Sequence, residues 1–186
     1  MNFSEYAQIT ASLLNRSSAL EKDVKTAIDI SIQTLQIGGR LFFCGNGGSA
    51  ADAQHWAAEL TGKLRKTGSP LSAISLTVDT SAITAIGNDY GFEYVFSRQL
   101  LGLGRPGDTL FAISTSGKSR SVLNACIKAR EMKIMVIGLT GVNGVELRVN
   151  SDVCLSVDSN NTEEIQHVHE VLGHYIMGEI ESAFRK

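Results

Sequence analysis

Five short runs of apolar residues are spaced along the chain, and longer segments with apolar residues at helical spacing lie between them. Each run is apolar at successive positions, so both of its faces are expected to be buried. Such strands are typical of a parallel sheet that helices cover on both sides. The runs are Arg40–Cys44, Ser72–Leu76, Thr109–Ile113, Ile134–Leu139 and Val153–Val157. The pattern predicts a doubly wound α/β domain, that is, a three-layer αβα sandwich around a five-stranded parallel sheet.

Helical periodicity fills most of the chain between these runs. Residues 3–37 contain no Pro or Gly and predict an added N-terminal helical segment, which can divide at Ser17-Ser18. A turn is predicted at Thr140–Gly144. Further helices are predicted up to about Thr61 and at Ser81–Ile86, Phe92–Leu103, Ser121–Met132 and Thr162–Phe184. No linker, repeat or low-complexity segment interrupts the chain, so residues 1–186 are predicted to form a single domain.

Composition and charge argue against several classes of partner. The net charge is −2 and no cluster of Lys or Arg stands out, so a nucleic-acid partner is not expected. No apolar run approaches the ~18 residues of a membrane span, and the first residues do not resemble a signal peptide. The three cysteines lack metal-like spacing and are expected to be free thiols in a reducing compartment. We therefore expect a cytoplasmic protein with no membrane partner.

The first candidate binding loop is Gly45–Ala50, which follows a predicted strand and opens a predicted helix. Glycines let the backbone approach a ligand, and free N–H groups at a helix start favour oxyanions. The loop also fits the G-x-G-x-x-A pattern of dinucleotide sites, which requires an acidic residue about 20 positions later. The nearest candidate, Asp79, lies 32 residues after Gly47, so a dinucleotide is disfavoured. A purely structural turn remains the alternative.

The second candidate loop is Ser114–Ser119, where four hydroxyl side chains lie between a strand and a helix. Hydroxyls together with helix N-terminal amides suit a single phosphate group. A nucleotide-binding P-loop would require glycine at position 112, which is Ala112 here. An ordinary helix cap is the structural alternative, but one cap needs only one hydroxyl. The loop therefore predicts a phosphate cradle.

The third candidate feature is a set of histidines and carboxylates on two predicted helices. His55 and Glu59 are four residues apart, which places them on one helical face. The last helix carries five further polar candidates, and helical spacing aligns His167 best with His174. Histidine and carboxylate ligands suit zinc or a similar divalent ion. The sequence alone leaves the ligands open among Gln166, His167, His169, Glu170 and His174.

These motifs together resemble the phosphoheptose isomerases of the sugar-isomerase (SIS) family, over nearly the whole chain. The resemblance implies the SIS fold, with a flavodoxin-like sheet. It rests on Gly45–Ser49, Asp52, His55, Glu59–Gly62, Gly87–Phe92, Ser97–Gln99, Ser114–Gly117, Leu139–Gly141, Ile165-Gln166, His169 and His174. Ala50, Ala51, Glu164 and His167 depart from the family pattern, which leaves open the heptose phosphate or the pathway branch.

The resemblance also implies an activity, a cofactor and an assembly. The implied reaction interconverts sedoheptulose 7-phosphate and an aldoheptose 7-phosphate, with Glu59 and His174 as the acid–base pair. One zinc ion would be held by His55, Glu59, Gln166 and His174, and the protein would be a homotetramer. Substrate contacts are implied for Asn46, Gly47, Gly48, Ser49, Asn88, Asp89, Ser114, Thr115, Ser116, Ser119 and Gln166.

Three other functions remain to be weighed. The family includes a non-catalytic member that binds the bacterial replication initiator, but that member lacks an acidic residue at the position of Glu59. A sensor of sugar phosphates normally carries an attached DNA-binding domain, for which this chain has no room. An isomerase of another sugar phosphate is the nearest alternative. Glu59 thus favours an enzyme over a binding module.

Overall fold

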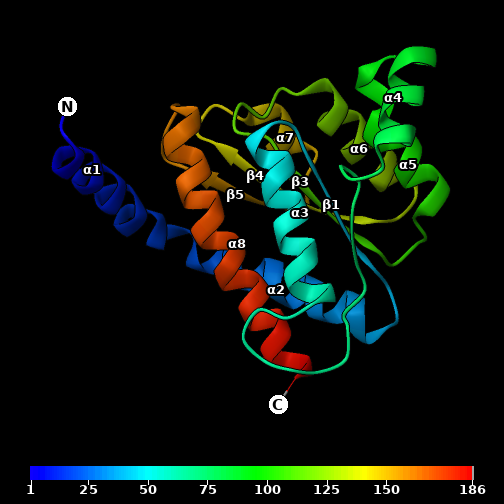
Figure 1. Ribbon diagram of the computed structural model, residues 1–186, viewed down its shortest axis with the longest axis horizontal. Helices are drawn as coiled ribbons and strands as arrows, with labels where there is room; N and C mark the ends of the chain where they lie inside the picture. Colours follow the sequence, from blue (N-terminus) through cyan, green and yellow to red (C-terminus); the bar gives the residue numbers. More distant parts are fainter. Residues whose placement is uncertain (186) are drawn as a thin grey trace.

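The computed structural model describes residues 1–185 and contains one five-stranded parallel sheet between helices (Figure 1). The strand order is β2-β1-β3-β4-β5, which confirms the predicted α/β fold. The strands are β1 (Leu41–Gly45), β2 (Ala73–Ser75), β3 (Thr109–Ile113), β4 (Met135–Gly141) and β5 (Val153–Val157). The helices are α1 (Phe3–Arg16), η1 (Ser17–Leu20), α2 (Glu21–Gln36), α3 (Gly48–Thr61), α4 (Thr80–Asp89), η2 (Phe92–Tyr94), α5 (Val95–Leu103), α6 (Arg120–Glu131), α7 (Val145–Val149) and α8 (Thr162–Phe184), with η1 and η2 as 3₁₀ turns.

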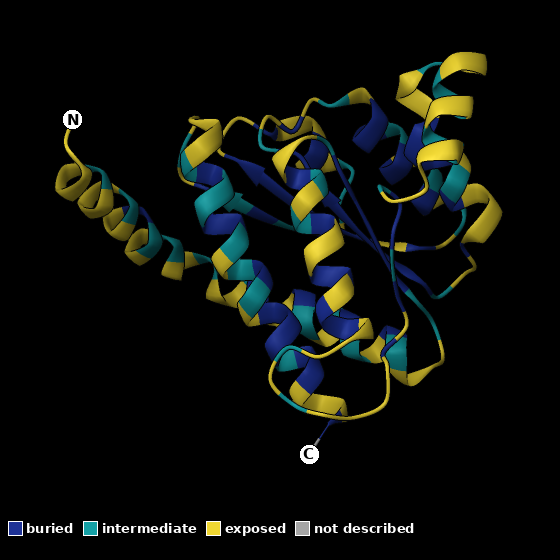
Figure 2. Ribbon diagram, in the orientation of Figure 1, coloured by how far each residue is buried: buried dark blue, intermediate teal, exposed yellow. Residues whose placement is uncertain are grey.

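Alternate side chains of each strand supply two separate cores, one on each face of the sheet. Leu41 and Phe43 of β1 pack with α2, α3 and α8, whereas Phe42 and Cys44 pack with α5, α6 and α7. All five residues of β1 are buried, and so are those of β3 (Figure 2). Strands buried on both faces account for the continuous apolar runs in the sequence.

The change in winding direction of the sheet lies between β1 and β3. These strands pair directly, with Gly45 opposite Ile113 at their carboxyl ends. The helix after β1 covers one face of the sheet, and the helix after β3 covers the other. Loops 46–47 and 114–119 therefore leave the sheet side by side. Ligands of open α/β sheets bind at this kind of switch point.

The N-terminal segment divides where the sequence predicted, because η1 separates α1 from α2. A reciprocal capping box closes the start of α1, in which Asn2 and Glu5 each accept the other's backbone N–H. The first helix extends beyond the sandwich (Figure 1). Its inner end is fixed by Leu13, which is buried with Val157, Ile165 and Val168.

Some local predictions differ from the structure, and one short helix was not predicted. Residues 92–103 form η2 followed by α5 rather than one helix, and β4 continues to Gly141, where the sequence predicted a turn from Thr140. The extension has a physical cause, since Thr140 and Gly141 pair with Ser156 and Val157 of β5. The short helix α7 was not predicted, because five residues are too few to show a helical period.

No helix among residues 1–185 is both long and apolar enough to cross a membrane.

Candidate active site

The loops after β1 and β3 enclose a cavity of about 360 Å³ at the switch point of the sheet. Gly47 adopts φ +58°, a conformation that favours glycine, and directly precedes α3. A Cβ on Gly48 would lie 2.4 Å from Nε2 of Gln166, so any other residue here would displace this amide of α8. The cavity is lined by Asn46, Gly47, Gly48, Ser49, Ile113, Ser114, Thr115, Ser116, Ser119, Thr162 and Gln166.

The serine-rich loop keeps hydroxyl groups available on this cavity. The hydroxyl of Ser114 is buried and has no hydrogen-bond partner within residues 1–185. Ser119 precedes α6 as its N-cap residue, but its side chain makes no capping bond. Gly117 has φ +66°, and a Cβ there would lie 2.3 Å from the Cα of Gly144, so a tight turn presses the loop against the next one. The helix starts of α3 and α6 and the free hydroxyls suit an anion such as phosphate.

A second group of side chains joins α3 to α8. Oε1 of Glu59 lies 2.7 Å from Nδ1 of His174 and 3.4 Å from Nε2 of His55. Oε1 of Glu170 lies 3.0 Å from Nδ1 of His55 and 3.2 Å from Nε2 of His174. The two imidazole rings are nearly perpendicular, with centroids 4.9 Å apart. Two histidines and two carboxylates thus form a closed ring of contacts.

Glu59 is the buried member of this group. Only 6% of its side chain is exposed, and its Oε2 has no hydrogen-bond partner within the described chain. Burial raises the pKa of Glu59, and the nearby imidazoles of His174 and His55 offset this only in part. A carboxylate with a raised pKa next to a histidine can both accept and return a proton.

The residues of this group also fit a divalent metal ion. The ligand-type atoms of His55, Glu170 and His174 lie within 4.8 Å of one another. Imidazole nitrogens and carboxylate oxygens are common zinc ligands, and a cation would satisfy the unpartnered oxygen of Glu59. Gln166, the amide in the ligand set implied by the resemblance, lines the 360 Å³ cavity one helical turn before Glu170.

The other two histidines of α8 lie away from this group. His169 is fully buried and its Nε2 lies 3.4 Å from the carbonyl oxygen of Thr140. Burial lowers the pKa of His169 to about 4. Nε2 of His167 lies 3.2 Å from the hydroxyl of Tyr6 in α1. The structure therefore distinguishes His174 from His167, which helical spacing alone could not do.

Two carboxylates near the histidines were not in the set of site residues implied by the resemblance. Glu170 contacts both imidazoles, and its spacing of four residues from His174 was the available sequence clue. One oxygen of Asp52 is buried without a partner in residues 1–185. Burial, assisted by Glu170, raises the pKa of Asp52 to about 6, although His55 opposes the shift.

The predicted substrate contacts Asn88 and Asp89 lie elsewhere in this chain. They are exposed at the end of α4, where Nδ2 of Asn88 donates to Oδ1 of Asp89. Neither lines the 360 Å³ cavity. No residue of α4 is buried, and Figure 1 shows this helix at the outer edge of the molecule. A single copy of the chain does not bring Asn88 and Asp89 to the predicted phosphate cradle.

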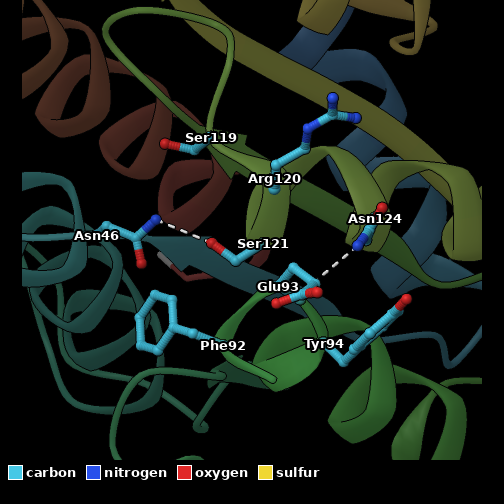
Figure 3. A pocket seen from close by; sticks show the side chains of 8 residues that line it. All are labelled: Asn46, Phe92, Glu93, Tyr94, Ser119, Arg120, Ser121 and Asn124. Atoms are coloured by element: carbon cyan, nitrogen blue, oxygen red, sulfur yellow. Dashed lines mark hydrogen bonds between the residues drawn. The ribbon is translucent and has the colours of Figure 1, made fainter. Parts of the chain in front are cut away.

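A larger cavity of about 660 Å³ adjoins the cradle and shares Asn46 and Ser119 with it. Figure 3 shows Nδ2 of Asn46 donating to Oγ of Ser121, at 2.9 Å. Nδ2 of Asn124 donates to the backbone carbonyl of Glu93 across the same space. The remaining lining comes from Phe92, Tyr94 and Arg120. The two cavities together provide room for an extended molecule with an anionic end.

Known proteins are similar to this chain in sequence and in fold. The model of the SIS domain matches residues 5–141. The phosphoheptose isomerase of Helicobacter hepaticus is 49% identical over 180 residues, which cover 97% of this chain and 90% of the relative. That of Rhodospirillum rubrum is 46% identical over 178 residues, which cover 96% and 95% of the two chains. The structure of the phosphoheptose isomerase from Neisseria gonorrhoeae superposes with a TM-score of 0.91, at 42% identity and 96% coverage of both chains. The chain therefore belongs to the SIS-domain family and, within it, to the phosphoheptose isomerases.

Proposed function

We propose that this protein is a ketose–aldose isomerase that converts D-sedoheptulose 7-phosphate to D-glycero-D-manno-heptose 7-phosphate. The product would serve bacterial heptose biosynthesis, for lipopolysaccharide core, capsule or another glycoconjugate. The observation that carries the proposal is the position of Glu59, whose buried carboxylate lies between two imidazoles on the helix that starts at the phosphate cradle. A binding module would have no evident use for this arrangement.

In this proposal the cradle holds the 7-phosphate and orients the open-chain sugar. The proposed contacts all line the cavity, and all but Gln166 of α8 come from the two loops and the helix starts that follow them. They are Asn46, Gly47, Gly48, Ser49, Ser114, Thr115, Ser116, Ser119 and Gln166. Fixing the remote end of the substrate places the reacting carbons and removes much of the entropic cost of the reaction. The neighbouring cavity bounded by Phe92 and Tyr94 would take the carbon chain.

Glu59 is the proposed general base. It removes the proton from C1 of the ketose and returns it to C2, while His174 moves a proton between the oxygens on C1 and C2. The 2.7 Å contact between Glu59 and His174 places the two groups of the acid–base pair side by side. In the metal-free chain burial raises the pKa of Glu59, and a base with a pKa nearer neutrality also returns the proton readily.

We also propose one zinc ion per subunit, held by His55, Glu59, Gln166 and His174. When bound, the ion would supply positive charge that polarises the substrate oxygens. The unpartnered Oε2 of Glu59 supports a cation at this place.

A cytoplasmic homotetramer completes the proposal. Large apolar side chains are exposed on α1, including Phe3 at 83% and Ile9 at 47%, and would be covered by a second subunit. Assembly would also give Asn88 and Asp89 a site to contact, since they lie away from the cradle of their own chain.

The test is a coupled isomerase assay with C5 to C7 ketose phosphates. We expect the highest kcat/KM for sedoheptulose 7-phosphate. Turnover of a shorter sugar in its place would reassign the substrate. If no sugar is turned over, the non-catalytic binding module becomes the better explanation.

A further inference from the structure

Each imidazole of the candidate metal site faces a carboxylate on both of its nitrogens. Nε2 of His55 and Nδ1 of His174 face Glu59. Nδ1 of His55 and Nε2 of His174 face Glu170, and both lie near the same oxygen, Oε1. The group therefore has two sides, of which one is bounded by Glu59 and the other by Glu170.

A neutral imidazole binds a metal through one nitrogen and keeps a proton on the other. The acceptor of that proton determines the tautomer and holds the ring in place. A divalent ion can therefore occupy only one side of the group, and the carboxylate on the other side accepts the two N–H groups. Proximity alone does not choose the side, since ligand-type atoms of His55, Glu170 and His174 also lie within 4.8 Å of one another. The hydrogen-bond partners of the two carboxylates do distinguish the sides.

The two carboxylates differ in whether their second oxygen has a hydrogen-bond partner. Oε2 of Glu59 is buried and has no hydrogen-bond partner within residues 1–185. The oxygen of Glu59 that faces the two rings is Oε1. An ion held by this carboxylate also neutralises the charge that Oε1 shares with Oε2, whereas an ion on the Glu170 side leaves the buried carboxylate without a positive partner. Oε2 of Glu170, in contrast, already accepts a hydrogen bond from Nε1 of Trp56, at 3.3 Å.

Trp56 is a firm anchor for Glu170. The side chain of Trp56 is completely buried. Its indole ring packs directly on Gly173, where an added Cβ would lie 2.0 Å from Cε2 of the ring. One oxygen of Glu170 is thus held by a fixed donor, and the other lies between the two histidines. Trp56 belongs to α3, so this contact also joins the two helices that carry the site.

We propose that Glu170 is a positioning residue that fixes the tautomer and the orientation of both metal-binding histidines. In this arrangement His55 carries its proton on Nδ1 and His174 on Nε2. Nε2 of His55 and Nδ1 of His174 are then left for the ion beside Glu59. The inference rests on the proposed zinc site but not on the identity of the sugar.

The first experiment measures zinc affinity by competition with a chelator in wild type, Glu170→Leu and Glu170→Gln. We expect Glu170→Leu to bind zinc about 10–100-fold more weakly, as is usual when the partner of a metal-binding histidine is lost. Glu170→Gln should lose less, because its amide oxygen can still accept one N–H. The melting temperature of the metal-free protein should change little, because Glu170 is 35% exposed.

The matched control is Glu179→Leu, which makes the same change on the same helix outside this group of contacts. It should bind zinc as the wild type does. Wild-type zinc affinity in Glu170→Leu would overturn the inference, and so would an equal loss in the control.

A crystal structure of the zinc-loaded protein gives the second readout. We expect Nε2 of His55 and Nδ1 of His174 at the ion, with Glu170 accepting from their other nitrogens. An oxygen of Glu170 at about 2.0–2.2 Å from zinc would make it a ligand and overturn the positioning role. A wild-type protein that binds no zinc would overturn this inference and the zinc site together. Tight zinc binding without isomerase activity would overturn only the proposed reaction.

Discussion

Two buried glutamates on neighbouring helices have opposite surroundings. Glu181 of α8 accepts hydrogen bonds from the backbone N–H groups of Leu64, Arg65 and Lys66, and from Arg185 at 2.7 Å. Glu59 of α3 has imidazole contacts on one oxygen and no partner for the other within the described chain. Both side chains are at most 6% exposed, so burial alone does not distinguish them.

The pKa values of the two carboxyl groups move in opposite directions. Burial tends to raise the pKa of Glu181, but the three backbone donors and Arg185 outweigh it and leave the pKa below its usual value. Burial dominates at Glu59, where the pKa is raised. A fully satisfied carboxylate anchors the loop 64–66 to α8, whereas an incompletely satisfied one is available to a proton, a metal ion or a substrate.

The largest effect is expected from Glu59→Gln. The change keeps the size of the side chain but removes the base, so kcat should fall by about 10²–10⁴ while the melting temperature stays nearly constant. His174→Gln should behave similarly. His167→Gln should retain most activity, since His167 contacts Tyr6 rather than the site. Steady-state kinetics and thermal unfolding check this prediction, and a Glu59→Gln enzyme with wild-type kcat would refute the mechanism.

Glu181→Gln is expected to lower the stability of the fold and to leave the activity nearly unchanged. This change leaves the guanidinium of Arg185, which is 1% exposed, without its charged partner. Breaking a buried ion pair typically lowers the free energy of unfolding by about 3–5 kcal/mol. Denaturant unfolding measures the loss. The kcat of the molecules that remain folded should stay near the wild-type value, and a selective loss of kcat would place Glu181 in the site.

The same contrast explains how much of the molecule could be predicted from the sequence. The strands β3 and β5 and the helix α8 were predicted with their observed bounds, because local periodicity alone defines them. The loops 46–47 and 114–119 were also identified, since parallel strands direct their carboxyl ends to one edge. Glu59 was singled out by its spacing from His55 and by the resemblance, but its contrast with Glu181 could not be predicted, because only the fold determines which donors surround each carboxylate.

The role of Glu170 was hidden for a similar reason. Its contact with His174 follows from helical spacing, but its contacts with His55 and Trp56 depend on how α3 packs against α8. Asn88 and Asp89 show the opposite situation. Their motif was recognisable, but one chain places them at the exposed end of α4.

A smaller effect is expected when hydroxyls of the cradle are removed. Ser116→Ala combined with Ser119→Ala deletes two donors that face the cavity without replacing them. A hydrogen bond to a charged group contributes about 1.5–3 kcal/mol, so KM should rise at least about tenfold, with a smaller change in kcat. The control is Ser182→Ala on α8, outside the cavity lining. An unchanged KM in the double variant would exclude these hydroxyls from phosphate binding.

The smallest effect concerns His169, a third buried ionisable group, which lacks a partner for Nδ1 in residues 1–185. Its pKa is lowered to about 4 from a usual 6.5, so the unfolded chain takes up a proton before the folded one does. The free energy of unfolding must therefore fall as the pH drops from about 6.5 towards 4, the interval between these two pKa values. The loss from this group should be about 1 kcal/mol between about pH 7 and about pH 5.5. Thermal unfolding of the metal-free protein over this range measures this loss.

The control variant His169→Gln cannot titrate, so its free energy of unfolding should fall less steeply as the pH drops, even if its absolute stability is lower. Parallel pH profiles for the two proteins would show that His169 is no more costly to protonate in the folded chain than in the unfolded one.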